Sequence, residues 1–436
     1  MKTLSDWLLH LEGLHPKGQA GIELGLDRIR QVKHVLGQQQ HCPVIVVGGT
    51  NGKGSTCAYL ENIIDRAGYK VGCYTSPHLV SYNERVRLNG VSVSDDLLCA
   101  AFQRVETARL AAGNVSLTYF EFGTLAAWEV FASVGVEAAI LEVGLGGRLD
   151  AVNAYEPDVS IVTTVALDHT DWLGPDRESI GFEKAGIFRS GKPAFCADPQ
   201  PPQRLLDQAA AIGADLRLIG RDFGFERPQG DANENRLQWR WWCRAGDSLV
   251  KRSLAYPGLR GPIQLYNASV ALAALDALGN KLPVTMQAIR PGLIETELSG
   301  RFQVLPGKPA IVLDVGHNPQ AVKVLAENLS SMGFFDRTYA VVGMLSDKDI
   351  AGALAPLKGK VDYWHLASLQ GPRGNSSQAL AEIIQEFELE GEVVCHDSPA
   401  EAMRAAKELA AESDRILVFG SFHTVAGALD ALGKKS

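Results

Sequence analysis

Short runs of apolar residues recur along the chain, separated by longer segments that mix apolar and charged positions. Such runs predict strands buried on both faces of a parallel sheet, and they lie at 44–47, 70–74, 138–141 and 158–167. The segments around them predict helices at 4–14, 27–36, 53–67, 95–112 and 119–134. Strands that alternate with helices are typical of an α/β fold with a doubly wound sheet.

The pattern changes after residue 222. Polar and aromatic residues alternate over 222–254, which predicts a small antiparallel β patch, and a helix is expected at 264–279. Between 280 and 300 we expect a short helix that ends at Pro291 and Gly292. A second α/β series then follows, with strands near 310–314, 338–343, 361–366, 392–395 and 415–419. The sequence therefore predicts two domains, 1–297 and 298–436.

Composition narrows the possible ligands. The 436 residues, 46% of them hydrophobic, are enough to bury a large core. The formal net charge of -8, without an obvious basic face, argues against binding to nucleic acid or to an anionic membrane. The most apolar long window, from Phe122 to Leu141, contains Glu129 and Glu137 and is not expected to span a membrane. Small anions are the expected ligands.

Cysteine usage indicates a reducing compartment. The seven cysteines are odd in number and form no C-x-x-C pair, so we expect free thiols and no cysteine metal site. The N-terminal stretch carries acids within its apolar pattern, unlike a signal peptide. A cytoplasmic protein is therefore expected.

The stretch VIVVGGTNGKGST, residues 44–56, predicts a phosphate site. Its glycines let the backbone turn sharply between a strand and a helix that starts near Lys53, and amides at a helix N-terminus bind phosphate. Lys53 adds a mobile charge, and Ser55 or Thr56 offers a hydroxyl to phosphate or Mg²⁺. The strict P-loop pattern is not met, because Val47 replaces its first Gly and Gly54 separates Lys53 from Ser55. A tight turn without a ligand is the alternative.

Three polar residues follow predicted strands at the edge that carries this turn. Glu142 ends one apolar run, His169 follows another, and Ser76 lies in TSPHL. A carboxylate buried at such a strand end requires a cation, and Mg²⁺ bound to phosphate would supply it. The alternatives are a salt bridge between Glu142 and Arg148, and a hydrogen-bonded core histidine at position 169.

Lys184 is expected on a helix at the same edge, fifteen residues beyond His169. A lysine in a dry site loses its proton readily, and the neutral amine adds CO₂ to form an anionic carbamate. The alternative is a lysine that pairs with Glu183 or with a phosphate. The residue types alone leave both interpretations open.

The second domain contributes GRFQV at 300–304 and LDVGHNPQA at 313–321. Arg301 is a candidate for neutralising a transferring phosphate, and Asp314 for holding a ribose or orienting that arginine. Asn318 is equally suited to capping the helix that starts at Pro319. Structural and functional interpretations also remain open for GSFHTV, residues 420–425, and for the glycine-rich loop at 15–29.

Ten motifs, taken in order, resemble one family: VGGTNGKGST, TSPHL, YFEFGTL, LEVGLGGRLDAVN, LDHTDWLG, EKAGIFR, GRFQV, DVGHNPQA, GMLSDKD and GSFHTV. The resemblance is to the bifunctional dihydrofolate synthases/folylpolyglutamate synthases, which are muramyl-ligase-like ATP-dependent amide ligases. It runs from about residue 5 to residue 433, and the Gly54 insertion is the form that this family uses.

The resemblance implies an N-terminal P-loop domain and a C-terminal Rossmann-like domain in a monomer. Its substrates would be ATP, L-glutamate, and dihydropteroate or a reduced folate. The folate carboxylate would attack the γ-phosphate of ATP, and the amine of glutamate would then displace phosphate from the acyl phosphate. Catalysis would consist mainly of positioning and charge neutralisation.

The resemblance also assigns site residues. For the nucleotide they would be Thr50, Asn51, Gly52, Lys53, Gly54, Ser55, Asn267, Arg301 and Asp314. Ser76 and Glu142 would hold one Mg²⁺ and His169 a second, with Lys184 carbamylated nearby. The pterin site would comprise Glu23, Leu24, Gly25, Thr118, Tyr119, Phe120, Glu121, Leu149, Asp150 and Ala151.

Two other functions fit parts of the pattern. A muramyl-peptide ligase would share the chemistry, but those enzymes carry a sugar-nucleotide domain ahead of the P-loop, and 43 residues precede the first strand here. A GTPase switch would need an Asn-Lys-x-Asp motif, whereas Asn280 and Lys281 are followed by Leu282 and Pro283.

Overall fold

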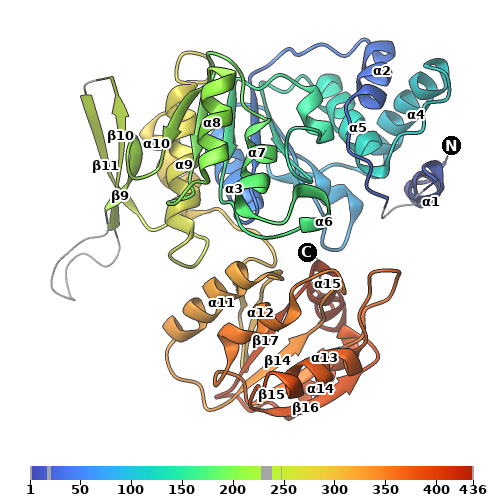
Figure 1. Ribbon diagram of the computed structural model, residues 1–436, viewed down its shortest axis with the longest axis vertical. Helices are drawn as coiled ribbons and strands as arrows, with labels where there is room; N and C mark the ends of the chain where they lie inside the picture. Colours follow the sequence, from blue (N-terminus) through green and yellow to red (C-terminus); the bar gives the residue numbers. More distant parts are fainter. Residues whose placement is uncertain (1, 17–20, 227–237, 247, 435–436) are drawn as a thin grey trace. The chain divides into compact units, whose positions relative to one another are not determined.

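The computed structural model describes residues 2–16, 21–226, 238–246 and 248–434. The chain divides into two compact units (Figure 1). Unit 1 comprises residues 1–77, 82–258 and 265–296, and unit 2 comprises 78–81, 259–264 and 297–436. Each unit has its own sheet and its own buried apolar clusters.

Unit 1 is built on an eight-stranded sheet of order β4-β3-β2-β5-β1-β6-β7-β8. Strands β2, β5, β1, β6, β7 and β8 are parallel, while β3 and β4 form an antiparallel edge. Their bounds are β1 Val44–Gly48, β2 Val71–Tyr74, β3 Val86–Leu88, β4 Val91–Ser92, β5 Ala138–Glu142, β6 Val159–Val162, β7 Pro193–Cys196 and β8 Asp215–Leu218. Every residue of β1 is buried, as its uninterrupted apolar run predicts.

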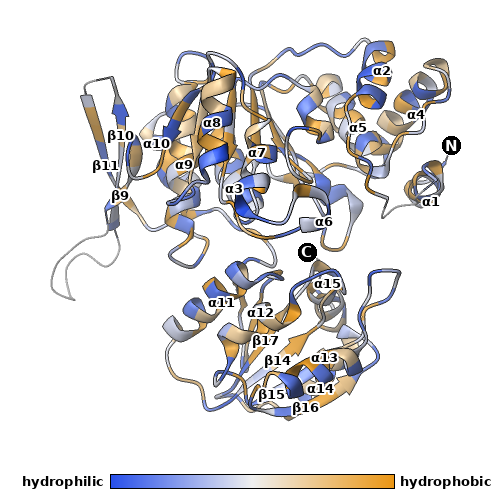
Figure 2. Cartoon of the chain, viewed as in Figure 1, coloured by the Kyte–Doolittle hydropathy of each residue, from blue (hydrophilic) through white to orange (hydrophobic). Residues whose placement is uncertain are grey.

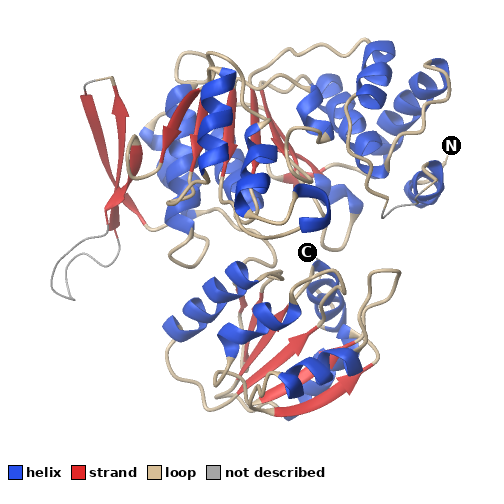
Figure 3. Ribbon diagram, in the orientation of Figure 1, coloured by secondary structure: helices blue, strands red, loops and turns tan. Residues whose placement is uncertain are grey.

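Helices cover both faces of this sheet (Figure 3). Val44 and Val46 of β1 join one large apolar cluster with α1 Leu4–Leu14, α2 Asp27–Leu36, α4 Asp95–Ala111, α5 Tyr119–Val134, α7 Arg177–Ala185 and α8 Gln203–Ile212. Successive strand residues point to opposite faces, so Ile45 and Val47 face away from that cluster. Helix α3, Lys53–Arg66, packs on β1, β2 and β5, and α10, Met286–Ile294, packs on α3. The sheet is therefore doubly wound, as expected.

The predicted β patch is an antiparallel sheet of order β11-β10-β9. It consists of β9 Phe223–Glu226, β10 Gln238–Ala245 and β11 Ser248–Ala255. Trp239 and Trp241 are both buried, and the Trp241 indole donates to the Ser269 carbonyl of α9, Gln264–Ala277, at 3.1 Å. Positions 227–237 and 247 of the predicted patch lie outside the described residues.

Unit 2 contains a six-stranded sheet of order β12-β13-β17-β14-β15-β16, parallel except for β12. The strands are β12 Gln303–Leu305, β13 Ala310–Leu313, β14 Thr338–Val342, β15 Tyr363–Ala367, β16 Glu392–His396 and β17 Arg415–Phe419. Val312, Val342 and Leu417 join a cluster with α11 Pro319–Ser331, α12 Ile350–Leu354 and α13 Ser377–Glu386. Leu313, Val341 and Val418 join another cluster with α14 Pro399–Leu409 and α15 Phe422–Ala431. Residues of one strand therefore alternate between the two clusters. The strands are mostly apolar and the helices are partly polar (Figure 2).

Two expectations about element ends were wrong. The strand predicted at 158–167 ends at Val162, because the residues after it form hydrogen bonds with the loop after β1. The helix expected to stop at Pro291 and Gly292 continues to Ile294. Tertiary packing explains the continuation: a Cβ on Gly292 would lie 2.7 Å from Ile63 Cγ1, and the Asn62 amide donates to the Gly292 carbonyl at 2.9 Å.

Three further features concern the strands, the cysteines and the length of the helices. The sequence pattern did not indicate the edge strands β3, β4 and β12 or the strands β7 and β8. All seven cysteines are free thiols. Among the residues that the structure describes, every helix is too short or too polar to cross a bilayer.

Candidate functional site

The turn between β1 and α3 depends on two glycines. Gly49 has a φ of 138°, and a Cβ there would lie 1.9 Å from Thr163 Oγ1. Gly52 has a φ of 89°, and a Cβ there would lie 2.5 Å from Asn267 Oδ1. Both glycines therefore have a positive φ, which residues with a side chain rarely adopt, and both lie close to a neighbouring side chain. A side chain at either position would displace the loop. Asn267 is 2% exposed and lies against this turn.

The segment after β6 holds the turn in place. The Thr50 amide donates to the Thr164 carbonyl at 2.7 Å, and the Thr50 hydroxyl donates to the Ala166 carbonyl at 3.2 Å. The hydroxyls of Thr163 and Thr164 donate to the Asn51 carbonyl at 2.7 and 3.1 Å. Because these bonds fix the backbone before any ligand binds, the turn is preorganised.

The N-terminus of α3 presents its amides without a side-chain cap, since the N-cap residue is Gly52. Lys53 folds back over the loop and donates from Nζ to the carbonyls of Gly49 and Thr50 at 3.1 and 3.2 Å. Thr56 directs its hydroxyl to the Gly52 carbonyl at 2.9 Å, and Ser55 is buried beside it. The arrangement combines the positive end of a helix with a lysine, which suits an anion.

Glu142 and Ser76 lie together at the same sheet edge. Glu142 is the last residue of β5, pairs in register with Val47 of β1, and is 4% exposed. The Ser76 amide donates to Glu142 Oε2 at 3.2 Å. Arg148, the alternative partner for Glu142, instead pairs with Glu183 at 2.8 Å. The predicted alternative, a salt bridge between Glu142 and Arg148, is therefore not formed.

His169 lies seven residues beyond the end of β6, in the N-cap position of α6, Thr170–Leu173. Its backbone is left-handed, with φ 52° and ψ 41°, which is uncommon for a residue with a side chain. Its side chain is 30% exposed, and Nε2 lies 3.9 Å from Asp168 Oδ1. The interpretation of His169 as a core histidine is therefore wrong, since the ring is open to solvent.

Lys184 is buried near the phosphate turn. Its side chain lies in α7 with 3% of the residue exposed. Burial, helped by the nearby charge of Lys53 and opposed by Asp168 and Asp150, lowers the pKa of Lys184 from 10.5 to about 7. Glu183, the alternative partner, pairs with Arg148. A substantial fraction of this amine is therefore neutral near pH 7, and the neutral form is chemically able to add CO₂.

The metal-ligating side chains are sparse. Within the part of the chain that the structure describes, no group of three His, Cys, Asp or Glu side chains is arranged to hold a metal. Mg²⁺ commonly binds through one or two carboxylates together with substrate phosphates and water. Glu142 with the Ser76 hydroxyl fits such a half-site, because the carboxylate is buried next to the phosphate turn.

The predicted pterin residues come from three segments that converge in unit 1. The Gly25 amide donates to the Leu149 carbonyl at 3.2 Å, which joins the first segment to the third. Asp150 accepts from the amides of Leu145 and Val152 at 2.8 and 3.0 Å, and burial raises its pKa to about 7. Phe120 stacks on Tyr74 with centroids 5.7 Å apart. An aromatic ring and a buried carboxyl group thus lie in neighbouring positions, which suits a flat heterocycle.

Some of these residues also have structural roles. Thr118 and Glu121 form the capping box of α5, in which the Thr118 amide donates to Glu121 Oε2 at 2.8 Å. Arg28 joins Glu23 to Glu121 and was missed by the sequence analysis. The available signal was weak: a basic residue on a helix beside two acidic residues that are far apart in the sequence.

In unit 2, Arg301 and Asp314 lie close to each other. Asp314 accepts from the amides of Phe302 and Gly316 at 2.9 and 2.7 Å. Burial raises the pKa of Asp314, against a lowering effect of Arg301. The Arg301 guanidinium lies over the Phe422 ring at 5.6 Å from its centroid. Both side chains are therefore oriented by neighbours in their own unit.

Two other motifs of unit 2 cap helices. Asn318 accepts from the Ala321 amide at 2.9 Å at the start of α11, with Pro319 in the first turn. Ser421 accepts from the Thr424 amide at 3.1 Å at the start of α15. The structural interpretation therefore accounts for both side chains.

Comparison with known proteins covers almost the whole chain. Residues 47–275 match the Mur ligase middle domain, and residues 300–422 match the Mur ligase glutamate ligase domain. The chain is 45% identical to the dihydrofolate synthase/folylpolyglutamate synthase of Escherichia coli (strain K12), over 98% of this chain and 95% of that protein. It is 39% identical to the protein of the same name from Haemophilus influenzae, over 97% and 96%.

Solved structures agree with these relatives. The structure described as E. coli FolC in complex with DHPP and ADP has a TM-score of 0.89 and 44% identity, covering 99% of this chain and 98% of that one. A bifunctional folylpolyglutamate synthase/dihydrofolate synthase with Mn, AMPPNP and L-glutamate bound has a TM-score of 0.88 and 44% identity, covering 99% and 98%.

Proposed function

Because the chain belongs to the dihydrofolate synthase/folylpolyglutamate synthase family of Mur ligases, which are ATP-dependent carbon–nitrogen ligases of folate synthesis, we propose that it joins L-glutamate to dihydropteroate. The product is dihydrofolate, and further glutamates are added to reduced folates. The observation that supports this most directly is the preorganised turn from Thr50 to Ser55, with Lys53 over it and Glu142 and Lys184 near it.

The reaction follows from the chemistry of a carboxylate. The folate carboxylate attacks the γ-phosphorus of ATP, and the bond from that phosphorus to the bridging oxygen breaks to release ADP. The amine of glutamate then adds to the acyl phosphate carbon, loses a proton, and expels phosphate. Lys53 and the amides at the start of α3 neutralise the phosphate charge, while the rigid turn orients it.

The nucleotide phosphates bind at the turn after β1 in unit 1. Thr50, Asn51, Gly52, Gly54 and Ser55 contact the phosphates together with Lys53. Asn267, which is buried against Gly52, supports the same turn. Arg301 neutralises phosphate charge, and Asp314 binds the ribose or orients Arg301.

Divalent metal assists through charge neutralisation when it is bound. Ser76 and Glu142 hold one Mg²⁺, and His169 holds a second. Lys184 carries a carbamate, which changes a buried cation into an anion beside these ligands and removes the repulsion that Lys53 would otherwise exert.

The pterin ring binds where three segments converge. These are Glu23, Leu24 and Gly25, then Thr118, Tyr119, Phe120 and Glu121, and finally Leu149, Asp150 and Ala151. Support comes from the bond between Gly25 and Leu149 and from the stacked rings of Phe120 and Tyr74. We place the enzyme in the cytoplasm, where its seven free thiols remain reduced, and expect a monomer.

Product analysis tests the proposal. The purified protein is incubated with MgATP, L-glutamate and either dihydropteroate or a reduced monoglutamyl folate, and the products are identified by mass. We expect dihydrofolate or a diglutamyl folate, with one ADP formed for each amide. Reactions lacking glutamate, and reactions with L-aspartate in its place, serve as controls. ADP formation without a glutamyl product would contradict the proposal.

A further inference from the structure

Arg28 of α2 connects two of the three segments that make up the proposed pterin site. Its guanidinium contacts the Glu23 carboxylate through one terminal nitrogen and donates to the Glu23 carbonyl at 2.7 Å through the other. Its Nε donates to Glu121 Oε2 at 3.3 Å, and the second terminal nitrogen lies 3.1 Å from Glu121 Oε1. One planar group therefore spans two carboxylates and a backbone carbonyl.

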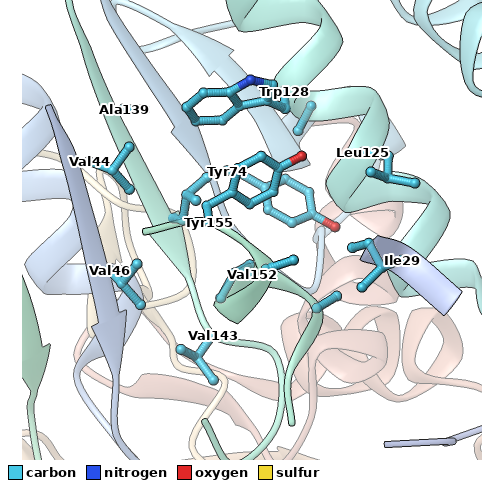
Figure 4. Close-up of a cluster of buried hydrophobic side chains, with 14 of the residues drawn as sticks. Ile29, Val44, Val46, Tyr74, Leu125, Trp128, Ala139, Val143, Val152 and Tyr155 are labelled. Carbon is cyan, nitrogen blue, oxygen red and sulfur yellow. The ribbon is translucent and has the colours of Figure 1, made fainter. Parts of the chain in front are cut away.

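The helix that carries Arg28 is held in place by apolar packing. Ile29, the next residue, is fully buried and points into the apolar cluster beside Leu125 of α5 and Val152 (Figure 4). The Arg28 side chain itself is 23% exposed, and that of Glu121 is 4% exposed. Packing thus fixes α2 against α5. Arg28 then holds the loop at Glu23 against these two helices.

The charges explain why an arginine is needed. Glu23 and Glu121 bring two carboxylates to one place, and His15 contacts Glu23 Oε2 through Nε2 at 3.2 Å. Glu121 already accepts from the Thr118 amide in the capping box. Removing Arg28 leaves a buried carboxylate without its cation and the two carboxylates without the group that joins them, so the loop would move away from α5.

We infer that Arg28 is a positioning residue that sets the affinity for the pterin part of the substrate by holding the loop from Glu23 to Gly25 against the N-terminus of α5. This inference rests on the proposed function. The contacts described for Arg28 are with Glu23 and Glu121, so it acts on the folate substrate and leaves the binding of ATP unchanged.

Steady-state kinetics of Arg28→Met and Arg28→Lys test the inference. For Arg28→Met we expect the KM for dihydropteroate to rise about tenfold or more, because the site loses its geometry, while the KM for ATP changes by less than about twofold. Arg28→Lys keeps the charge but has one ammonium in place of a planar fork, so its KM for dihydropteroate should lie between those of Arg28→Met and the wild type.

A matched control is another arginine that pairs with a glutamate of α5. Arg104 of α4 pairs with Glu129 of α5 at 2.7 Å, and its side chain is 42% exposed. Arg104→Met also removes a cation from α5 and should leave all three KM values unchanged. Thermal unfolding of each variant shows whether it folds, and if Arg28→Met does not, Arg28→Lys decides.

The outcomes separate the inference from the function it rests on. An unchanged KM for dihydropteroate in the folded Arg28 variants would overturn the positioning role. So would an equal rise in the KM values for dihydropteroate, ATP and glutamate, which indicates general damage. A wild-type protein that makes no dihydrofolate would instead contradict the proposed function.

Discussion

The turn from β1 to α3 in unit 1 and the turns into α11 and α15 in unit 2 share one plan but differ at a single position. Each links a buried parallel strand to a helix. In unit 2 the N-cap residues Asn318 and Ser421 accept a hydrogen bond from their own helix. In unit 1 the N-cap is Gly52, which has no side chain to do so.

The difference shows how a common structural element becomes a binding site. A capped helix satisfies part of its own N-terminus, whereas an uncapped one retains amides and a positive potential for a ligand. The conformations agree with this. Asn318 and Ser421 are extended, with φ of −135° and −167°, but Gly52 has a φ of 89°. A strand-to-helix turn alone is therefore not enough to predict a phosphate site, and our proposal for the turn after β1 rests on the missing cap together with Lys53.

The largest effect is expected from Lys53→Met, which removes the mobile charge from the uncapped turn. The rate of ATP-dependent ligation should fall about 10³-fold, because a charge aimed at the transferring phosphate is lost. The unfolding temperature should change little, since Lys53 is only partly buried and its hydrogen bonds go to carbonyls of the loop itself. Lys70→Met, at an exposed lysine, is the control. Unfolding of the Lys53 variant would show that Lys53 has a structural role. The uncapped turn of unit 1 would then not differ in function from the capped turns of unit 2.

Replacing Lys184 should reduce ligation about 10²-fold, because this buried lysine lies near Lys53 of the uncapped turn. Lys184→Ala should regain part of its activity with acetate, whereas Lys184→Arg, which cannot form a carbamate, should remain inactive. Ligation rates at fixed dissolved CO₂ provide the measurement. An active arginine variant would count against the carbamate.

The lowered pKa of Lys184 also gives a pH dependence. A carbamate forms only from the neutral amine, so activity at constant CO₂ should decline as the pH falls below about 7. For the unmodified lysine, the unfolded chain binds more protons than the folded one between about pH 7 and 10.5, so stability should rise with pH over that window. Denaturant unfolding of the CO₂-free protein measures this slope, and Lys184→Met should lack it.

An effect of intermediate size on stability and nucleotide binding is expected from adding a side chain to the turn between β1 and α3. Gly49→Ala places a Cβ against Thr163 and requires a backbone that alanine disfavours, so we expect a loss of about 3 kcal/mol in the free energy of unfolding. Binding of an ATP analogue should weaken as well. Calorimetry of the variant tests both, and Gly68→Ala, where no atom lies near the added Cβ but φ is also positive, separates backbone strain from steric contact.

The smallest effect should come from the capped turns. Ser421→Ala removes the cap of α15 and should lower the free energy of unfolding by about 1 kcal/mol. Asn318→Ala should do the same at α11. The folded form of each variant should bind an ATP analogue with the same affinity as the wild type. A tenfold loss of nucleotide affinity in either variant would mean that the capped turns also bind ligand.

Much of the site follows from features that are close together in the sequence. The phosphate turn needs only a strand, glycines at fixed positions and Lys53, all within thirteen residues. The caps at Asn318 and Ser421 likewise involve residues three apart. Such contacts are set by local backbone geometry, so the pattern of residues is enough to predict them.

Contacts between distant segments were decided by the tertiary structure. The bond from Arg28 to Glu121 joins residues 93 positions apart. The passage of α10 through Pro291 depends on packing against α3, and the end of β6 depends on bonds to the loop after β1. The exposure of His169 and the burial that lowers the pKa of Lys184 also depend on which elements pack around them. By itself the sequence determined the buried strands β1, β2 and β5, the helices beside them and the glycine-rich turn after β1, because these depend on local periodicity and glycine geometry. It did not indicate the strands β3, β4, β7, β8 and β12. Only the folded chain decided which charges are desolvated and which are paired, because desolvation is a property of the whole surrounding protein.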